Sequence, residues 1–163
     1  MDNNNIHPLN TSWILWYHQP DDMNWDTNSY KEVCKISSIE DFWLIYNNIK
    51  SSQIENGMFF LMRENVFPRW EDSKNKNGGC WSFKVEKKKV YSIWLDLCIC
   101  ITGEKIMSNI DDTTYINGVS ISPKKGFSII KIWISDKSKN KKSLLSRDID
   151  FLDVDSCIYK NHR

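Results

Sequence analysis

The stretch KEVCKISSIEDFWLIYNNI, residues 31–49, joins two different periodicities in one short run. From residue 31 to residue 37, apolar and polar side chains alternate, which is the pattern of a half-buried strand. From Ile39 onward the apolar residues recur at helical spacing, and Ser38 followed three positions later by Asp41 is the signature of a capped helix start. The stretch therefore predicts a strand and then a helix through Ile49, which is typical of a domain that combines a sheet with helices.

Outward from this stretch, most of the remaining pattern also predicts strands. Runs rich in β-branched and aromatic residues occupy 11–17, 58–62, 80–85, 116–122 and 129–134, and a weak helical pattern occupies 143–152. Residues 91–102 are ambiguous, because their β-branched side chains favour a strand while their apolar spacing and Gly103 favour a helix. No repeat or linker divides the chain. We expect one domain over residues 1–163, of α+β class with a mostly antiparallel sheet, and a flexible arm over residues 1–10.

The composition is that of an ordinary globular chain without a strong charge. Of the 163 residues, 40% are hydrophobic and 26% are charged, and the formal net charge is +1. No overall field therefore attracts the protein to DNA or to acidic membranes, and any polyanion must meet a local patch. No apolar run reaches the roughly 18 residues of a membrane span, and the polar start is unlike a signal peptide. We expect a cytoplasmic monomer that binds neither DNA nor membranes.

The sequence predicts neither a metal site nor a catalytic site. Its five cysteines are odd in number and include no C-x-x-C pair, and its three scattered histidines add no zinc spacing. In a cytosolic protein such cysteines are reduced thiols. The motifs of the common hydrolases, metalloproteases and nucleotide-binding loops are absent from the sequence. We therefore expect no enzymatic activity, no metal and no cofactor.

The eight tryptophans are the most informative feature of the composition. Trp25 and Trp70 each lie in a polar loop, where a large ring stays exposed unless something covers it. Two indole faces about 7 Å apart can hold a flat cationic ring between them, and the carboxylate of Glu71 can accept hydrogen bonds from its N–H edge. A base that is both cationic and rich in N–H donors is 7-methylguanine. The alternative is that both rings fold back onto the core, as tryptophans usually do.

The tryptophans and their neighbours together resemble one known family. The segments are WILW at 13–16, the single Trp25, EDFW at 40–43, PRWED at 68–72, NKNGGCW at 75–81, WLD at 94–96 and IW at 132–133. In this order they resemble the cap-binding translation initiation factor 4E, and the resemblance covers roughly residues 7–162. It implies a curved, cupped antiparallel sheet with about three helices on its convex face, and it makes residues 91–102 a helix.

The resemblance implies a binding site for the 7-methylguanosine cap at the 5′ end of mRNA. Trp25 and Trp70 would stack on the two faces of the methylated base. Glu71 would accept hydrogen bonds from the guanine N1–H and the exocyclic amine, and Trp133 would touch the N7-methyl group. Capped mRNA is therefore the expected ligand.

The phosphate-binding part of the resemblance is incomplete. Cys80 and Ser122 stand where the family has arginines, and Ile129 stands where it has a lysine. A serine can donate a hydrogen bond to a phosphate oxygen but brings no charge, and a cysteine brings still less. The expected phosphate contacts are Ser122, Lys124, Lys125 and Lys131. Lys131 shares a sheet face with Trp133 unless a bulge separates the two.

The resemblance also implies a second, dorsal surface that binds a protein helix. In the family this surface receives the Tyr-x-x-x-x-Leu-hydrophobic helix of the scaffold factor 4G or of repressor proteins, which is helix-in-groove recognition. The matching residues are His7, Pro8, Leu9, Ile39, Trp43, Leu95, Asp96 and Ile99. By helical spacing alone, Trp43 can instead be an inward-facing core residue, because its neighbours on the helix are apolar.

Three functions remain open at this point. The protein is an initiation factor that binds the cap and recruits a scaffold, a cap-binding repressor without productive recruitment, or an interaction module that no longer binds the cap. The third applies if the missing arginines removed too much charge from the phosphate site. The chain has no alanine and 18 lysines against 4 arginines, which fits an AT-rich genome and suggests a divergent protist or a large DNA virus as the source.

Overall fold

The computed structural model describes residues 5–162, and these residues form one seven-stranded sheet. The strands are β1 (Pro8–His18), β2 (Tyr30–Ser38), β3 (Met58–Arg63), β4 (Gly79–Glu86), β5 (Ile116–Pro123), β6 (Phe127–Ile134) and β7 (Ile158–Asn161). They lie in the order β2-β1-β3-β5-β6-β4-β7, and every neighbouring pair is antiparallel. The predicted α+β class with an antiparallel sheet is confirmed.

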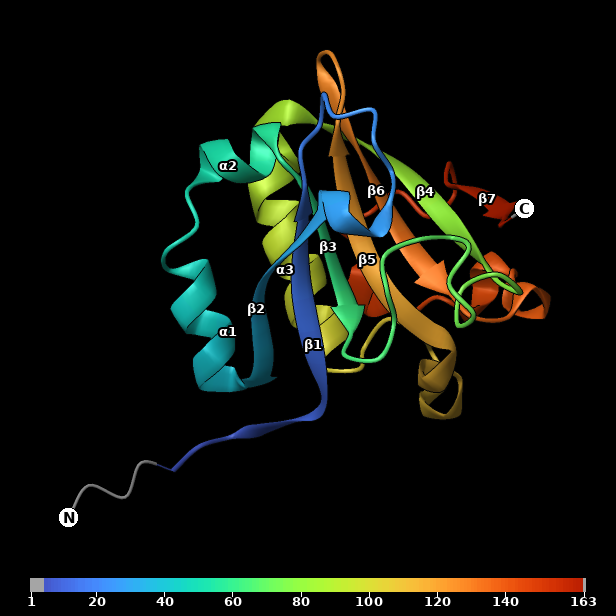
Figure 1. Ribbon diagram of the computed structural model, residues 1–163. Helices are drawn as coiled ribbons and strands as arrows, with labels where there is room; N and C mark the ends of the chain where they lie inside the picture. Colours follow the sequence, from blue (N-terminus) through green and yellow to red (C-terminus); the bar gives the residue numbers. More distant parts are fainter. Residues whose placement is uncertain (1–4, 163) are drawn as a thin grey trace.

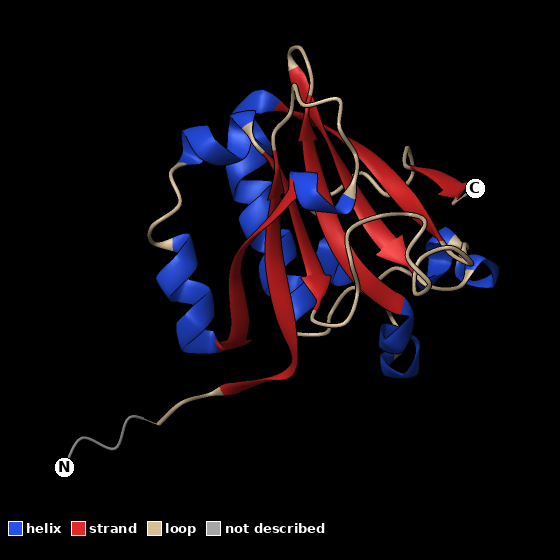
Figure 2. Ribbon diagram, in the orientation of Figure 1, coloured by secondary structure: helices blue, strands red, loops and turns tan. Residues whose placement is uncertain are grey.

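The described residues contain α-helices on one side of this sheet. They are α1 (Ile39–Tyr46), α2 (Ser51–Asn56) and α3 (Val90–Thr102). Figures 1 and 2 show α1 and α2 at one edge and α3 behind the strands, while two long loops cross the front. The ambiguous segment is therefore a helix, as the resemblance implied. We call the sheet face opposite the α-helices the open face.

The prediction that the first helix continues through residue 49 is wrong. α1 ends at Tyr46, where the side-chain amide of Asn48 donates to the carbonyl oxygen of Leu44 at 2.6 Å and ends the regular turn. A separate helix, α2, then follows and was not predicted. It has six residues and one buried side chain, Ile54, so it leaves almost no periodic apolar signal in the sequence.

Other differences lie near the two ends of the chain. β1 begins at Pro8, so residues 8–10 belong to a strand and not to the expected arm, while residues 1–4 lie outside the described part. Residues 143–152 form short 3₁₀ helices in place of the predicted helix, because the Ser146 hydroxyl accepts from the backbone N–H of Asp148 and closes a turn. The 3₁₀ helices are Thr27–Ser29, Lys87–Lys89, Ile110–Tyr115, Lys137–Lys139, Lys142–Leu144 and Arg147–Ile149.

The sheet carries an apolar layer on each face. The larger layer packs against the helices, and Trp13, Trp81 and Trp94 are completely buried in it. A smaller cluster lies on the open face and consists of Tyr30, Met58, Phe60, Met62, Val66, Cys80 and Trp133. Alternation of side chains along each strand separates the two layers, since successive residues point to opposite faces.

A nearly buried ion pair joins the end of β3 to the turn after α3. Arg63 donates from Nη1 and Nη2 to the two carboxylate oxygens of Glu104, each at 2.8 Å, and only 13% and 10% of the two side chains are exposed. The guanidinium also donates to the carbonyl oxygens of Ile116 and Thr113, and it lies 4.5 Å from the ring centre of Trp13. The pair is therefore fully hydrogen-bonded, which a buried charge requires.

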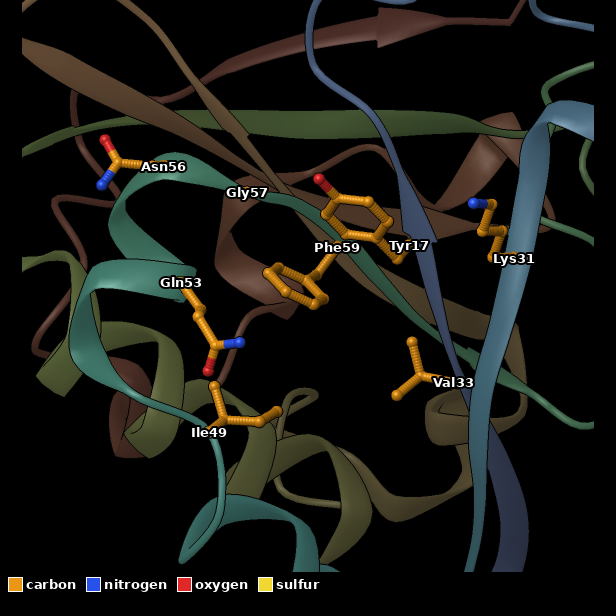
Figure 3. A pocket seen from close by; sticks show the side chains of 8 residues that line it. All are labelled: Tyr17, Lys31, Val33, Ile49, Gln53, Asn56, Gly57 and Phe59. Atoms are coloured by element: carbon orange, nitrogen blue, oxygen red, sulfur yellow. The ribbon is translucent and has the colours of Figure 1, made fainter.

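A cavity of about 460 Å³ opens between strands β1–β3 and α2. Figure 3 shows the side chains around it, which come from Tyr17, Lys31, Val33, Ile49, Gln53, Asn56, Gly57 and Phe59. None of the residues predicted to bind the cap or a partner lines this cavity.

Candidate functional site

Two loops on the open face carry the two tryptophans of the predicted sandwich. Residues 19–29 connect β1 to β2 and contain Trp25, and residues 64–78 connect β3 to β4 and contain Trp70 (Figure 1). The side chains are 43% and 45% exposed, so neither ring is folded into the core. Tyr30 links the loops, because its ring centre lies 6.3 Å from that of Trp25 and 5.2 Å from that of Phe67.

The first loop is held by His18, whose importance the sequence did not indicate. The imidazole is completely buried and stacks on Trp25 with ring centres 4.1 Å apart and planes 4° from parallel. Its Nδ1 lies 2.9 Å from the carbonyl oxygen of Gln19, and its Nε2 lies 2.8 Å from that of Asn24. One face of Trp25 is thus covered by protein, which leaves the opposite face for a ligand.

The second loop is held by a buried side-chain amide. Asn75 is completely buried and donates to the carbonyl oxygens of Phe67 at 2.9 Å and Arg69 at 2.7 Å, and it accepts from the amide of Asn117 at 2.8 Å. Both carbonyls lie within three residues of Trp70. The amide therefore fixes the backbone that presents this exposed ring.

Glu71 projects next to Trp70 and is oriented by an ion pair. The Nη2 of Arg69 lies 3.1 Å from Oε1 of Glu71, which leaves Oε2 for a ligand. Burial raises the pKa of the nearby Tyr30 to about 12, while Arg69 lowers and Glu71 raises that pKa to smaller extents. Both charges of the pair thus act on Tyr30, the residue that links the two loops.

Beside Trp70, a cavity of about 400 Å³ extends across the open face. We call it the open-face cavity, and it is lined by Trp70, Cys80, Ser82, Lys131, Trp133, Lys160, Asn161 and His162. Trp133 is 7% exposed and donates from Nε1 to the hydroxyl of Ser120 at 2.9 Å. Its ring centre lies 6.2 Å from that of Phe60 and 5.1 Å from that of His162, so the indole is a rigid wall of the cavity.

The structure brings together only part of the predicted cap site. Trp70 and Trp133 line the open-face cavity, whereas Trp25 does not. Lys131 lines it as well, because β6 pairs with β4 without a bulge from Phe127 to Ile134 and so keeps Lys131 on the face of Trp133.

The other predicted phosphate contacts lie outside the open-face cavity. Ser122 is in β5 opposite Ile129, and Lys124 and Lys125 are in the turn between β5 and β6. That turn is closed by the backbone N–H of Lys124, which donates to the carbonyl oxygen of Phe127 at 2.8 Å. The structure therefore places only Lys131 of this predicted set beside the tryptophans.

The charge of the open-face cavity comes from lysines. Lys160, which the sequence analysis missed, enters from β7 and adds a second positive charge to that of Lys131. Burial and the charge of Lys131 lower the pKa of His162, which Glu71 offsets in part. Burial raises the pKa of Cys80 to about 12. Near pH 7 the histidine and the thiol are therefore uncharged, and the lysines make the lining basic.

A second candidate site lies on the helical side of the sheet. A cavity of about 250 Å³ opens between β1, α1 and α3, within the predicted dorsal surface. We call it the dorsal cavity, and it is lined by Leu9, Ile39, Phe42, Trp43, Ile99, Thr102 and Gly103. Trp43 is 41% exposed, and its ring meets Phe42 edge-on at 5.2 Å. This geometry excludes the alternative that Trp43 is an inward-facing core residue.

The remaining predicted partner-binding residues lie around the dorsal surface. The Nδ1 of His7 is 2.6 Å from Oε1 of Glu40, and this hydrogen bond lowers the pKa of Glu40 to about 2. Pro8 pairs with Ser38 at the start of β1. Leu95 and Asp96 lie about one turn before the dorsal residue Ile99 on α3.

Two structural features are absent from the part of the chain that the structure describes. Among residues 5–162, no group of three or more His, Cys, Asp or Glu side chains is arranged to hold a metal ion. No helix within the same range is long and apolar enough to cross a membrane.

Comparisons with known proteins show which family the sequence matches. Residues 8–163 match the family model of eukaryotic initiation factor 4E. The chain is 34% identical over 144 residues to eukaryotic translation initiation factor 4E1 of Drosophila melanogaster, covering 85% of this chain and 54% of that protein. It is 34% identical over 145 residues to eukaryotic translation initiation factor 4E of Candida albicans, covering 83% and 68%. The chain thus spans only about half the length of the Drosophila relative.

Solved structures agree with this match. Ascaris suum eIF4E-3 with m7G cap has a TM-score of 0.80 and 27% identity, with coverage of 97% of this chain and 92% of that one. C. elegans eIF4E-3 with the 4E-binding protein Mextli has a TM-score of 0.81 and 25% identity, with coverage of 96% and 94%. These relatives are animal and yeast proteins and give no support to a viral source. The chain belongs to the eukaryotic initiation factor 4E family.

Proposed function

We propose that the protein binds the 7-methylguanosine cap of mRNA on its open face and recruits a scaffold initiation factor through its dorsal surface. The observation that carries the proposal is the half-exposed Trp70, which precedes Glu71 and lines a cavity together with two lysines. The family match supports it, as does the similarity to a structure solved with m7G cap.

In the proposed complex, the base stacks on the exposed face of Trp70. Trp25 covers the other side of the base with the ring face that His18 leaves uncovered, which requires the loop of residues 19–29 to shift toward Trp70, since Trp25 does not line the cavity. The methylated base carries a positive charge, which both indole π-faces attract. Oε2 of Glu71 accepts from the N–H edge of the guanine while Arg69 keeps Oε1 in place.

The decisive experiment compares methylated and unmethylated ligands. Quenching of tryptophan fluorescence is measured with 7-methylguanosine triphosphate and with guanosine triphosphate. We expect the methylated ligand to bind at least about tenfold more tightly, because only its base is cationic and the cation–π term is worth about 2 kcal/mol or more in a desolvated site. Equal affinities would contradict the proposed function.

The variant Glu71→Gln tests whether the carboxylate recognises the base by accepting its hydrogen bonds. We expect it to lose about 1.5–3 kcal/mol of binding free energy for 7-methylguanosine triphosphate, because a charged acceptor is replaced by a neutral amide. The measurement is the same fluorescence titration. Glu64→Gln, in the same loop, is the matched control and is expected to bind normally. Unchanged affinity in Glu71→Gln would assign base recognition to another group.

The variant Trp43→Ala tests the dorsal surface separately. We expect it to weaken binding of a labelled Tyr-x-x-x-x-Leu peptide by at least about 2 kcal/mol, as loss of a hot-spot tryptophan does, and to leave cap binding intact. Fluorescence anisotropy measures the peptide affinity. Leu44→Ala is the control, because Leu44 is the next residue on α1, is 66% exposed and does not line the dorsal cavity. Equal losses in the two variants would contradict the assignment.

Recruitment of a scaffold factor to capped RNA distinguishes the proposed initiation factor from a repressor. A cap-binding repressor without productive scaffold recruitment retains the open-face site but does not bring a scaffold factor to capped RNA. The assay is assembly of a ternary complex on capped RNA with a scaffold fragment that carries the helix motif. Cap binding without ternary assembly would favour the repressor.

A further inference from the structure

Strand β7 adds a cation to the open-face cavity through its register with β4. In the pairing of these strands Lys160 lies opposite Cys80, and Cys80 in turn lies opposite Trp133 of β6. Partners in an antiparallel pair point to the same face of the sheet. Trp133, Cys80 and Lys160 therefore form one row across three strands. Lys131 stands in the next row, opposite Ser82.

The small side chains between the lysines leave the space that a ligand needs. Cys80 is 6% exposed and forms part of the cavity lining with Ser82. No Asp or Glu lines the cavity of about 400 Å³ in the described residues, so nothing there pairs with the two ammonium groups. A cavity with two cations and no carboxylate favours an anion that carries more than one charge.

The position of this basic pair relative to Trp70 points to the chemistry of that anion. Trp70 lines the same cavity as Lys131 and Lys160, so phosphates attached to a base stacked on the indole have two ammonium groups within the same cavity. On the basis of the proposed function, we propose that Lys160 is a specificity-determining residue that binds the phosphate chain of the cap jointly with Lys131.

The experiment follows how affinity grows with each added phosphate. Tryptophan fluorescence is titrated with 7-methylguanosine and with its mono-, di- and triphosphate, at several salt concentrations. The variants are Lys160→Gln and Lys160→Arg. The matched control is Lys105→Gln, because Lys105 is also exposed but follows the end of α3 and does not line the open-face cavity.

We expect Lys160→Gln to bind the triphosphate about three- to tenfold more weakly and the nucleoside as the wild type does. The slope of log affinity against log salt concentration should fall by about one unit, because one fewer phosphate charge is neutralised. Lys160→Arg should retain both the affinity and the slope, since it keeps the charge. Lys105→Gln should change neither quantity.

Two outcomes would overturn this inference and leave the proposed function standing. One is a Lys160→Gln protein whose gain in affinity per phosphate and salt slope equal those of the wild type. The other is a similar loss in the double variant Lys124→Gln/Lys125→Gln with none in Lys160→Gln, which would direct the phosphates to the β5–β6 turn. Failure of the proposed function is distinct, because the wild type would then not prefer the methylated base with any number of phosphates.

Discussion

Replacing Trp70 with alanine is expected to abolish binding of the cap, with a loss of about 2–4 kcal/mol, or roughly 30- to 800-fold in affinity. The variant removes the stacking surface and its attraction for the cationic base. It should leave the fold intact, because the ring is 45% exposed and the loop backbone is held by the buried Asn75. The measurement is isothermal calorimetry with 7-methylguanosine triphosphate, with the thermal midpoint recorded for each protein.

Three related variants test whether the loss of affinity comes from the removal of a stacking ring. Trp70→Phe keeps a smaller aromatic face and should recover part of the lost affinity. Trp25→Ala should lose a similar amount as Trp70→Ala if Trp25 closes over the base. Trp43→Ala, on the other side of the sheet, should bind the cap normally. An affinity within threefold of wild type in Trp70→Ala or Trp25→Ala would rule that ring out of the sandwich.

The second large effect concerns stability, and it arises at the Arg63–Glu104 pair. We expect Arg63→Met to lower the free energy of unfolding by about 3–5 kcal/mol, because the variant leaves the carboxylate of Glu104 buried without a partner. It also removes the donors to the carbonyl oxygens of Ile116 and Thr113. Urea unfolding monitored by circular dichroism measures the change. The thermal midpoint should fall by roughly 6–20 °C for a chain of this length.

The controls separate the buried charge from a general effect of mutation. Arg63→Met/Glu104→Gln removes the uncompensated charge and should be more stable than Arg63→Met alone. Lys35→Met breaks the pair with Glu64, whose side chains are 49% and 52% exposed, and should cost less than about 1 kcal/mol. A loss in Arg63→Met as small as that in Lys35→Met would show that the buried pair does not stabilise the fold.

The elements that local pattern predicts correctly are those with a strong period. The start of α1 follows from Ser38, whose hydroxyl accepts from the backbone N–H of Asp41 at 3.0 Å as its capping signature predicts. The missed elements lack such a signal. α2 buries only Ile54, and β7 has four residues with none buried, so neither shows a periodic apolar face. They form because α2 packs near α3 and β7 pairs with β4.

The residues of the candidate sites also divide into those that a local sequence pattern indicates and those that it does not. A tryptophan within a polar loop is visible in the sequence, so Trp25 and Trp70 were identified, and both rings are exposed as that pattern predicts. His18 and Lys160 gave no comparable signal. His18 ends an apolar strand, and its contacts with Asn24 and Trp25 depend on how the loop after that strand folds back. Lys160 lies in an exposed segment and pairs with Cys80, which is distant in the sequence.

The sequence alone determined the class of fold, the family resemblance and the exposed aromatic side chains, because periodicity and local polarity are properties of neighbouring residues. Only the tertiary structure decided that Trp43 faces outward and that Lys131 and Lys160 share a cavity with Trp70. The physical reason is strand register. A shift of one residue in the pairing of β7 with β4 would turn Lys160 to the other face of the sheet, and that register is set by contacts between distant segments of the chain.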